Sequence, residues 1–150
     1  MKEYILKLLF FLLINITNGQ SILSESDKNE IISVLKKQEK FWNKGDIDGF
    51  MQGYVKSDYL VFNGSKGPFY GWDSVKDRYI KTYPSKEEMG ILNFKIQNIS
   101  LITSNVAQLL GQFFLNYPKK QVSGYFTLVF IKSKGRWLIF SDHTSRSELG

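Results

Sequence analysis

The chain has 150 residues, of which 43% are hydrophobic, 15% aromatic and 23% charged, which is the size and balance of one globular domain. It contains no cysteine and a single histidine, His143, which excludes disulfides, thiolate nucleophiles, cysteine-bound zinc and multi-histidine metal sites. The net charge of +6 comes from scattered basic residues, not from a dense stripe, so we expect no nucleic-acid partner. We also expect no metal site and no cofactor.

The first residues have the pattern of a signal peptide. Lys2 and Lys7 flank the start of an apolar run over residues 8–14, which is shorter than the about 20 residues that a membrane-spanning helix needs. Thr17 and Gly19 are the small residues that would precede a cleavage site.

We therefore predict a bacterial-type signal peptide over residues 1–19 and a single domain over residues 20–150. The mature protein is then secreted or periplasmic, with no stable membrane span after cleavage. The alternatives are an uncleaved anchor or a buried amino-terminal helix, because Glu3 and Asn15 both weaken the pattern.

Three helices are predicted in the first half of the chain. Apolar residues at helical spacing predict a helix that begins after a capping Ser24 or Ser26 and ends at Gly45. Asp46 is the expected cap of a short second helix. A third helix is predicted over residues 72–83, where apolar residues again recur at helical intervals.

Most of the remaining sequence has the alternation of β-strands. Residues 59–62 predict a short strand, and the segment from Asn63 to Pro68 is expected to be a turn or flexible loop. Four longer strands, joined by short turns and hence antiparallel, are predicted over residues 91–103, 106–117, 121–132 and 136–145. Gly111 and Gly124 are candidate sites of bulges or bends. The order of elements indicates an α+β fold in which helices cover one face of a bent sheet and leave a cleft.

Four segments in this order resemble the nuclear-transport-factor-2-like superfamily, with SnoaL-like and ketosteroid-isomerase-like domains as the most similar members. They are W-N-K-G-D-I-D-G-F from Trp42, G-W at residues 71–72 with Tyr79 and Tyr83-Pro84, G-Y-F-T-L-V-F from Gly124, and G-R-W-L-I-F-S-D-H-T-S from Gly135. The resemblance covers essentially the whole chain after the signal peptide. It implies a cone-shaped, cystatin-like roll of three helices on a bent antiparallel sheet, with an internal pocket and dimerisation through the outer face of the sheet. It does not define the chemistry, because the superfamily contains isomerases, cyclases, dehydratases and pockets with no known reaction.

Asp142 and His143 are the candidate catalytic residues, since they form the only acid–imidazole pair in the chain. Adjacent residues of a straight strand point to opposite faces, so only one of them would enter the cleft unless the strand ends or bulges there. In a straight strand His143 shares a face with Trp137, Ile139 and Ser141, and Asp142 shares the other with Leu138, Phe140 and Thr144. The alternatives are a hydrogen-bonded structural histidine and a carboxylate that accepts structural hydrogen bonds.

Six further side chains are candidates for ligand binding: Trp42, Tyr54, Trp72, Arg78, Tyr79 and Tyr83. Arg78 either binds a ligand carboxylate or lies on the wet face of its helix. The tyrosine hydroxyls are suited to a carbonyl or enolate oxygen, as the ketosteroid-isomerase-like resemblance implies. Residues 91–117 contain no Asp or Glu, so the isomerase base has no counterpart there. Phe62, Phe94, Phe113 and Tyr125 are expected in the pocket wall or the core.

Two functions remain open from the sequence. The first is a small-molecule-binding domain with an aromatic-lined pocket for an apolar or aromatic ligand, with acid–base catalysis of the isomerase, cyclase or dehydratase type undecided. The second is a non-catalytic homodimeric association module, which aromatic residues on both faces of the last two strands would favour.

Overall fold

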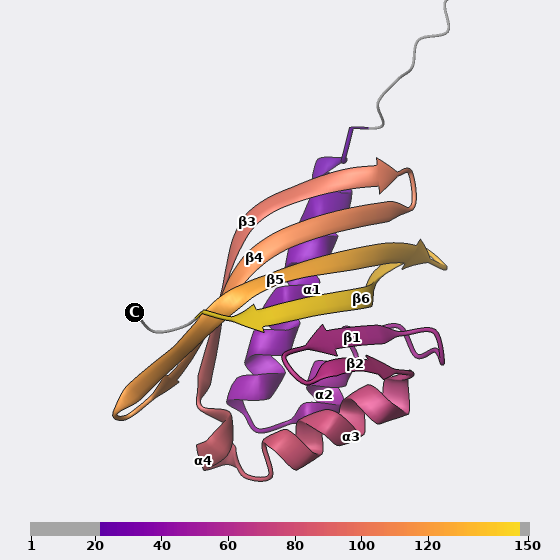
Figure 1. The fold of residues 1–150 in the computed structure, drawn as a ribbon. Coiled ribbons are helices and arrows are strands. Elements are labelled where there is room, and N and C mark those ends of the chain that lie inside the picture. Colours follow the sequence, from indigo (N-terminus) through magenta and orange to yellow (C-terminus); the bar gives the residue numbers. More distant parts are fainter. Residues whose placement is uncertain (1–21, 148–150) are drawn as a thin grey trace, which may run out of the picture.

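A computed structural model describes residues 22–147, so the predicted signal peptide lies outside the described residues. Helices and strands alternate in the first half and strands fill the second (Figure 1). The elements are α1 (Glu25–Asn43), α2 (Ile47–Met51), β1 (Val61–Gly64), β2 (Gly67–Tyr70), α3 (Trp72–Thr82), α4 (Lys86–Met89), β3 (Ile91–Thr103), β4 (Val106–Tyr117), β5 (Lys120–Ser133) and β6 (Arg136–Arg146).

The strands form one six-stranded sheet in the order β2-β1-β6-β5-β4-β3. All neighbouring pairs are antiparallel except β1 and β6, which run parallel. In Figure 1 the long strands β3 to β6 bend past α1, and α2, α3 and α4 lie at the lower end of the sheet. The inner face of the sheet carries the core, with Leu109, Phe130, Trp137 and Ile139 almost completely buried. The predicted α+β class is confirmed.

Hydrogen bonds to two acidic residues hold α1 against the sheet. Ser24, one of the two predicted caps, caps α1 by accepting a hydrogen bond from the backbone N–H of Asp27. Asp27 Oδ1 in turn accepts hydrogen bonds from Lys132 Nζ at 2.6 Å and Trp137 Nε1 at 2.8 Å. These donors lower the pKa of Asp27 to about 2, with the bond from Lys132 as the largest cause. Glu30 adds a bond from the backbone N–H of Trp137 at 3.0 Å.

The first half of the chain differs from the prediction at two places. Four helices are present in the described residues, not three, because Ser85 caps the short helix α4. Four residues are too few to show a helical period in the sequence. The predicted loop from Asn63 to Pro68 is instead the paired end of the β1–β2 hairpin, in which only residues 65 and 66 form the turn.

Of the two candidate bulge or bend sites, Gly111 does lie at a bulge, although the extra residue, Gln97, belongs to the partner strand β3. Gly124 lies in regular register with β4. Both glycines serve close packing: a Cβ at Gly111 would lie 2.4 Å from the ring of Phe126, and one at Gly124 would lie 2.6 Å from the ring of Phe113. Each glycine is thus covered by an aromatic ring of a neighbouring strand, an arrangement known to protect glycine in sheets.

The irregularity that matters for the site is in β6. Val129 pairs with Ser141 and Phe130 pairs with Ile139, so Phe140 is an extra residue that the partner strand does not match. Of the two cases that the sequence left open, a straight strand and a bulged one, the structure has the bulged one. Trp137 and Ile139 face the core before the bulge, and Asp142 takes over the buried position after it.

Among residues 22–147, no helix combines the length and the apolar character needed to cross a membrane.

Candidate functional site

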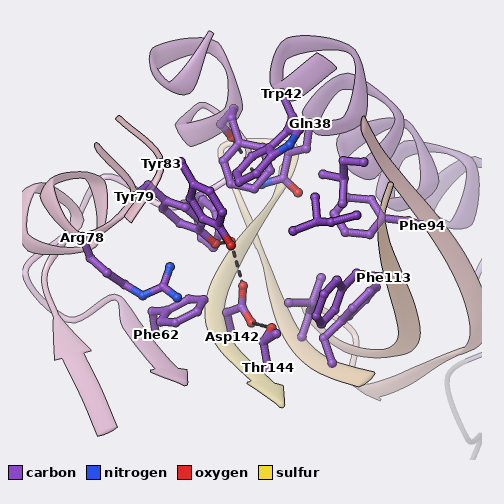
Figure 2. A pocket seen from close by; sticks show the side chains of 16 residues that line it. Gln38, Trp42, Phe62, Arg78, Tyr79, Tyr83, Phe94, Phe113, Asp142 and Thr144 are labelled. Carbon is purple, nitrogen blue, oxygen red and sulfur yellow. Dashed lines mark hydrogen bonds between the residues drawn. The ribbon is translucent and has the colours of Figure 1, made fainter. Parts of the chain in front are cut away.

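A hollow lies between the helices and the inner face of the sheet. Its volume is about 80 Å³, and its wall is mostly aromatic and aliphatic (Figure 2). We call it the aromatic cavity. It is lined by Gln38, Trp42, Phe50, Tyr54, Phe62, Arg78, Tyr79, Tyr83, Leu92, Phe94, Phe113, Leu115, Phe126, Leu128, Asp142 and Thr144.

Trp42 organises the helical side of this cavity. Its ring lies edge-on to Tyr83 at 4.8 Å and to Phe50 at 5.2 Å between centroids, a favourable arrangement for aromatic pairs. Its indole N–H donates to the backbone oxygen of Met89 at 3.1 Å. Gln38, one turn earlier on α1, donates to the backbone oxygen of Phe50 at 3.2 Å. Both N–H donors are thus tied to backbone oxygens, and the rings form an apolar wall.

Asp142 is the only carboxyl group among the described residues that line the cavity. Its side chain is 4% exposed. Oδ2 accepts a hydrogen bond from the Tyr54 hydroxyl at 2.7 Å, and Oδ1 accepts one from the Thr144 hydroxyl at 2.7 Å. The Tyr79 hydroxyl lies 3.2 Å from that of Tyr54. Because the hydroxyl hydrogen of Tyr54 is used in the hydrogen bond to Asp142, the Tyr79 hydroxyl is the donor in the bond between the two tyrosines. Figure 2 shows Asp142 and Thr144 rising from β6 into the middle of the hollow.

Backbone pairing explains how Tyr54 reaches Asp142. The backbone N–H of Val55 donates to Ile139, and the N–H of Ile139 donates to Gly53, both at 2.9 Å. This parallel bridge holds Tyr54 beside β6 just before the bulge. β1 then takes over as the partner of β6, and its Phe62 pairs with Asp142. The bulge therefore lies where β6 changes partner.

Burial dominates the electrostatics of this network. It raises the pKa of Asp142 above the ordinary value of a carboxyl group, against the opposing effect of the hydrogen bonds from Thr144 and Tyr54. Burial and the nearby Asp142 charge also raise the pKa values of Tyr54 and Tyr79. Both phenols consequently remain protonated donors at neutral pH, and Asp142 is the member of the network that can exchange a proton most readily.

Five of the six candidate ligand-binding residues line the aromatic cavity, and Asp142 joins them. Trp72 does not: its indole N–H donates to the backbone oxygen of Met51 at 3.1 Å, which ties the start of α3 to α2. His143 is exposed on the opposite face of β6, where it pairs with Thr127. The structure therefore separates the two candidate catalytic residues. Tyr125 is 50% exposed, which corrects its expected place in the wall or core.

Two polar residues of the cavity were not among the candidates. Thr144 lies two positions after Asp142, and this spacing places both on one face of the strand. Gln38 interrupts the apolar face of α1 and is 2% exposed. A polar residue on an apolar face was the available signal. No group of three or more His, Cys, Asp or Glu side chains that would suit a metal ion occurs within the described part of the chain.

Removing the Tyr54 hydroxyl should raise the pKa of Asp142 further, because that hydroxyl stabilises the charged carboxylate. In Tyr54→Phe we expect the carboxyl carbon of Asp142 to titrate at a higher pH than in the unmodified protein. The measurement is a ¹³C NMR titration of aspartate-labelled protein, with Asp142 assigned by the signal that Asp142→Asn removes. Ser145→Ala, an exposed change on the same strand, is the control; an equal shift there, or none in Tyr54→Phe, would contradict the assigned network.

Neither a protein-family model nor a curated protein matches the chain. Solved structures do. A nuclear-transport-factor-2-like protein of unknown function from Shewanella oneidensis superposes with a TM-score of 0.76 and 37% sequence identity, over 79% of this chain and 98% of that one. A domain of unknown function with a cystatin-like fold from Nostoc punctiforme gives a TM-score of 0.72 at 16% identity, over 84% of this chain and 80% of that one.

A third similar structure is a ketosteroid-isomerase-like protein from Erwinia carotovora atroseptica, with a TM-score of 0.68 and 14% identity over 84% of this chain and all of that one, 100%. The last two likenesses concern the fold alone. The Shewanella protein is similar enough in sequence, over nearly its whole length, to fix the relationship. The chain, with its helices on a bent six-stranded sheet, belongs to the nuclear-transport-factor-2-like superfamily.

Proposed function

We propose that this protein binds a small, largely apolar or aromatic molecule in the aromatic cavity. The observation that carries the proposal is a single buried carboxyl group, Asp142, set among aromatic walls on two sides of a hollow. Apolar pockets with a few convergent polar groups are the usual form of small-molecule sites. Membership of the superfamily adds support, since other members include ligand-binding and isomerase-like domains.

The polar network supplies the hydrogen-bonding groups that the apolar wall lacks. Asp142 accepts one hydrogen bond on each oxygen and keeps further lone pairs for a ligand hydroxyl or amine. If a bound ligand is transformed, Asp142 is the group in position to take up or release the proton, and the two tyrosines are the donors beside it. His143 has no part in this proposal because it faces away from the cavity.

The proposal predicts that neutral aromatic compounds bind and that filling the cavity prevents it. We expect 3-phenylpropanamide and 1-naphthylacetamide to give saturation-transfer NMR signals with the unmodified protein. Leu128 lines the cavity and is 4% exposed. Leu128→Phe should weaken binding at least tenfold, since a ring contributes about 1.5–3 kcal/mol when buried and the new ring takes its place.

The matched control for this experiment is Val129→Phe, the same kind of enlargement at the neighbouring position, which faces the outside of the sheet. Urea unfolding of each variant checks that the fold persists. Binding of neither amide to the unmodified protein, or equal binding by Leu128→Phe, would contradict the proposal.

We further infer that the protein is exported, with residues 1–19 removed. Support comes from the sequence pattern of Lys2, Lys7, the apolar run and the small residues before Gln20. The intact mass of protein recovered from the periplasm or the medium should correspond to a chain that begins at Gln20. Recovery of the full-length chain from that fraction would contradict cleavage.

The second candidate function is a homodimeric association module, and one observation favours it. The outer face of the sheet carries apolar side chains that are half-buried or exposed, namely Leu110, Phe114, Tyr125, Val129, Ile131 and Leu138. Polar residues such as Gln112 and Thr127 lie between them, and a face of this mixed composition is compatible with an interface.

Light scattering after size-exclusion chromatography should then find a dimer that dissociates on dilution. We expect Tyr125→Lys to shift the protein towards monomer because it replaces a half-exposed aromatic ring of this face by a charge. Tyr59→Lys is the control, since Tyr59 is 78% exposed and lies outside the sheet. A monomer at every concentration would contradict the association module and leave the ligand-binding proposal intact.

A further inference from the structure

A second hollow adjoins the aromatic cavity. Its volume is about 440 Å³, and it shares Phe62, Arg78, Tyr83, Phe113 and Thr144 with the smaller cavity. We call it the basic vestibule. It is lined by Phe62, Gly64, Ser65, Lys66, Phe69, Arg78, Lys81, Thr82, Tyr83, Phe113, Thr144 and Arg146. The shared residues make the two hollows neighbouring parts of one site.

The charges of the vestibule have a single sign. Four basic side chains line it, and none of the described lining residues is acidic. They come from three places in the fold: Lys66 from the β1–β2 turn, Arg78 and Lys81 from α3, and Arg146 from the end of β6. Between residues 22 and 147, the ion pairs within 4 Å involve none of these four. Such a cluster attracts anions.

Arg78 differs from its exposed neighbours in being held and partly buried. Its guanidinium carbon lies 3.9 Å from the centroid of the Phe62 ring and 4.8 Å from that of Tyr79. Stacking on rings keeps an arginine in one orientation and leaves its N–H groups free to donate in the plane of the guanidinium. Figure 2 shows Arg78 with its guanidinium group over Phe62, facing the hollow from the side of α3.

The buried Nη1 nitrogen of Arg78 has no acceptor for its N–H groups in the part of the chain that the structure describes. Nη1 is shielded from solvent and has no hydrogen-bond partner among the described residues. A buried donor without a partner is unfavourable, and more so when it is charged. The nearest carboxyl group of the site does not meet this need, because Asp142 receives its hydrogen bonds from Tyr54 and Thr144 and forms no ion pair with Arg78. An anionic ligand group would satisfy it.

We propose that the ligand carries a carboxylate, which Arg78 binds in the basic vestibule while the apolar body of the ligand occupies the aromatic cavity. The forked, planar guanidinium matches a carboxylate with two parallel hydrogen bonds. Lys66, Lys81 and Arg146 add attraction over a longer range. This inference rests on the proposed function, because the apolar body needs the cavity next to the vestibule. It narrows the ligand class to small aromatic or aliphatic carboxylic acids.

The test compares each acid with its uncharged amide. Isothermal titration calorimetry with 3-phenylpropanoate and 1-naphthylacetate should give dissociation constants at least tenfold lower than with 3-phenylpropanamide and 1-naphthylacetamide. In Arg78→Gln the ratio of the two affinities should fall to below threefold. Arg78→Lys keeps the charge but loses the fork, so its ratio should lie between those two values. Lys37→Gln, which removes an exposed charge from α1, is the control and should keep the full ratio.

The outcomes separate the carboxylate site from the binding function. Equal binding of acids and amides by the unmodified protein would overturn the carboxylate site and leave the binding function standing. Binding of none of the four compounds would overturn both. Tighter binding of 2-phenylethylphosphonate than of 3-phenylpropanoate would overturn the carboxylate class in favour of a phosphonate or phosphate. If Arg78→Gln fails to fold, the double variant Lys81→Gln/Arg146→Gln takes its place, and an unchanged ratio in that variant and in Arg78→Lys would overturn the inference.

Discussion

A single extra residue in β6, Phe140, decides which chemistry faces the aromatic cavity. Side chains alternate along a strand, so an insertion of one residue exchanges the two faces from that point onward. Without the bulge, His143 would lie on the face of Trp137 and Ile139, and Asp142 would point outward. With it, the cavity receives a carboxyl group, and the imidazole lies on the outer surface. The change of partner along β6, from the Gly53–Val55 segment to β1, occurs at the same place.

The buried position of Asp142 imposes the rest of the site. A carboxylate removed from water is unfavourable unless it is hydrogen-bonded, and this need accounts for the two hydroxyl groups that contact it. Tyr54 and Thr144 provide them from two different parts of the chain, and Tyr79 extends the network to α3. Asp142 therefore connects β6, α3 and the turn after α2, and it is both a structural centre and the candidate reactive group. The structural and functional interpretations of this carboxylate are compatible.

Periodicity and end signals predicted most of the fold from the sequence. The caps Ser24 and Asp46 and the bounds of β3 and β4 were correct, because they depend on local side-chain chemistry and on alternation. The bulge was not predictable in the same way: Phe140 is an ordinary strand residue, and the mismatch becomes visible only when β5 lies alongside. Gly124 lies in regular register, and a ring on the neighbouring strand explains the glycine there, whereas Gly111 lies opposite a bulge whose extra residue, Gln97, is on β3. Local sequence signals predict helices and strands, whereas the pairing between strands decides which side chains enter the cavity.

The two ends of the composite hollow differ in charge, and this difference would orient a ligand of the proposed class. Basic side chains surround the wide vestibule, and the one carboxyl group among the described lining residues, Asp142, lies in the narrow aromatic cavity. An amphipathic acid makes favourable contacts at both ends when its carboxylate faces Arg78 and its apolar body lies in the aromatic cavity beside Asp142. The reverse orientation places two carboxyl groups together in a poorly solvated space, where like charges repel strongly, and it leaves the buried Nη1 of Arg78 without an acceptor. The repulsion between carboxyl groups and the missing acceptor of Arg78 therefore both favour the orientation with the carboxylate at Arg78. With the carboxylate held at Arg78, the distance along the ligand from that carboxylate then determines which atom of its apolar body lies beside Asp142.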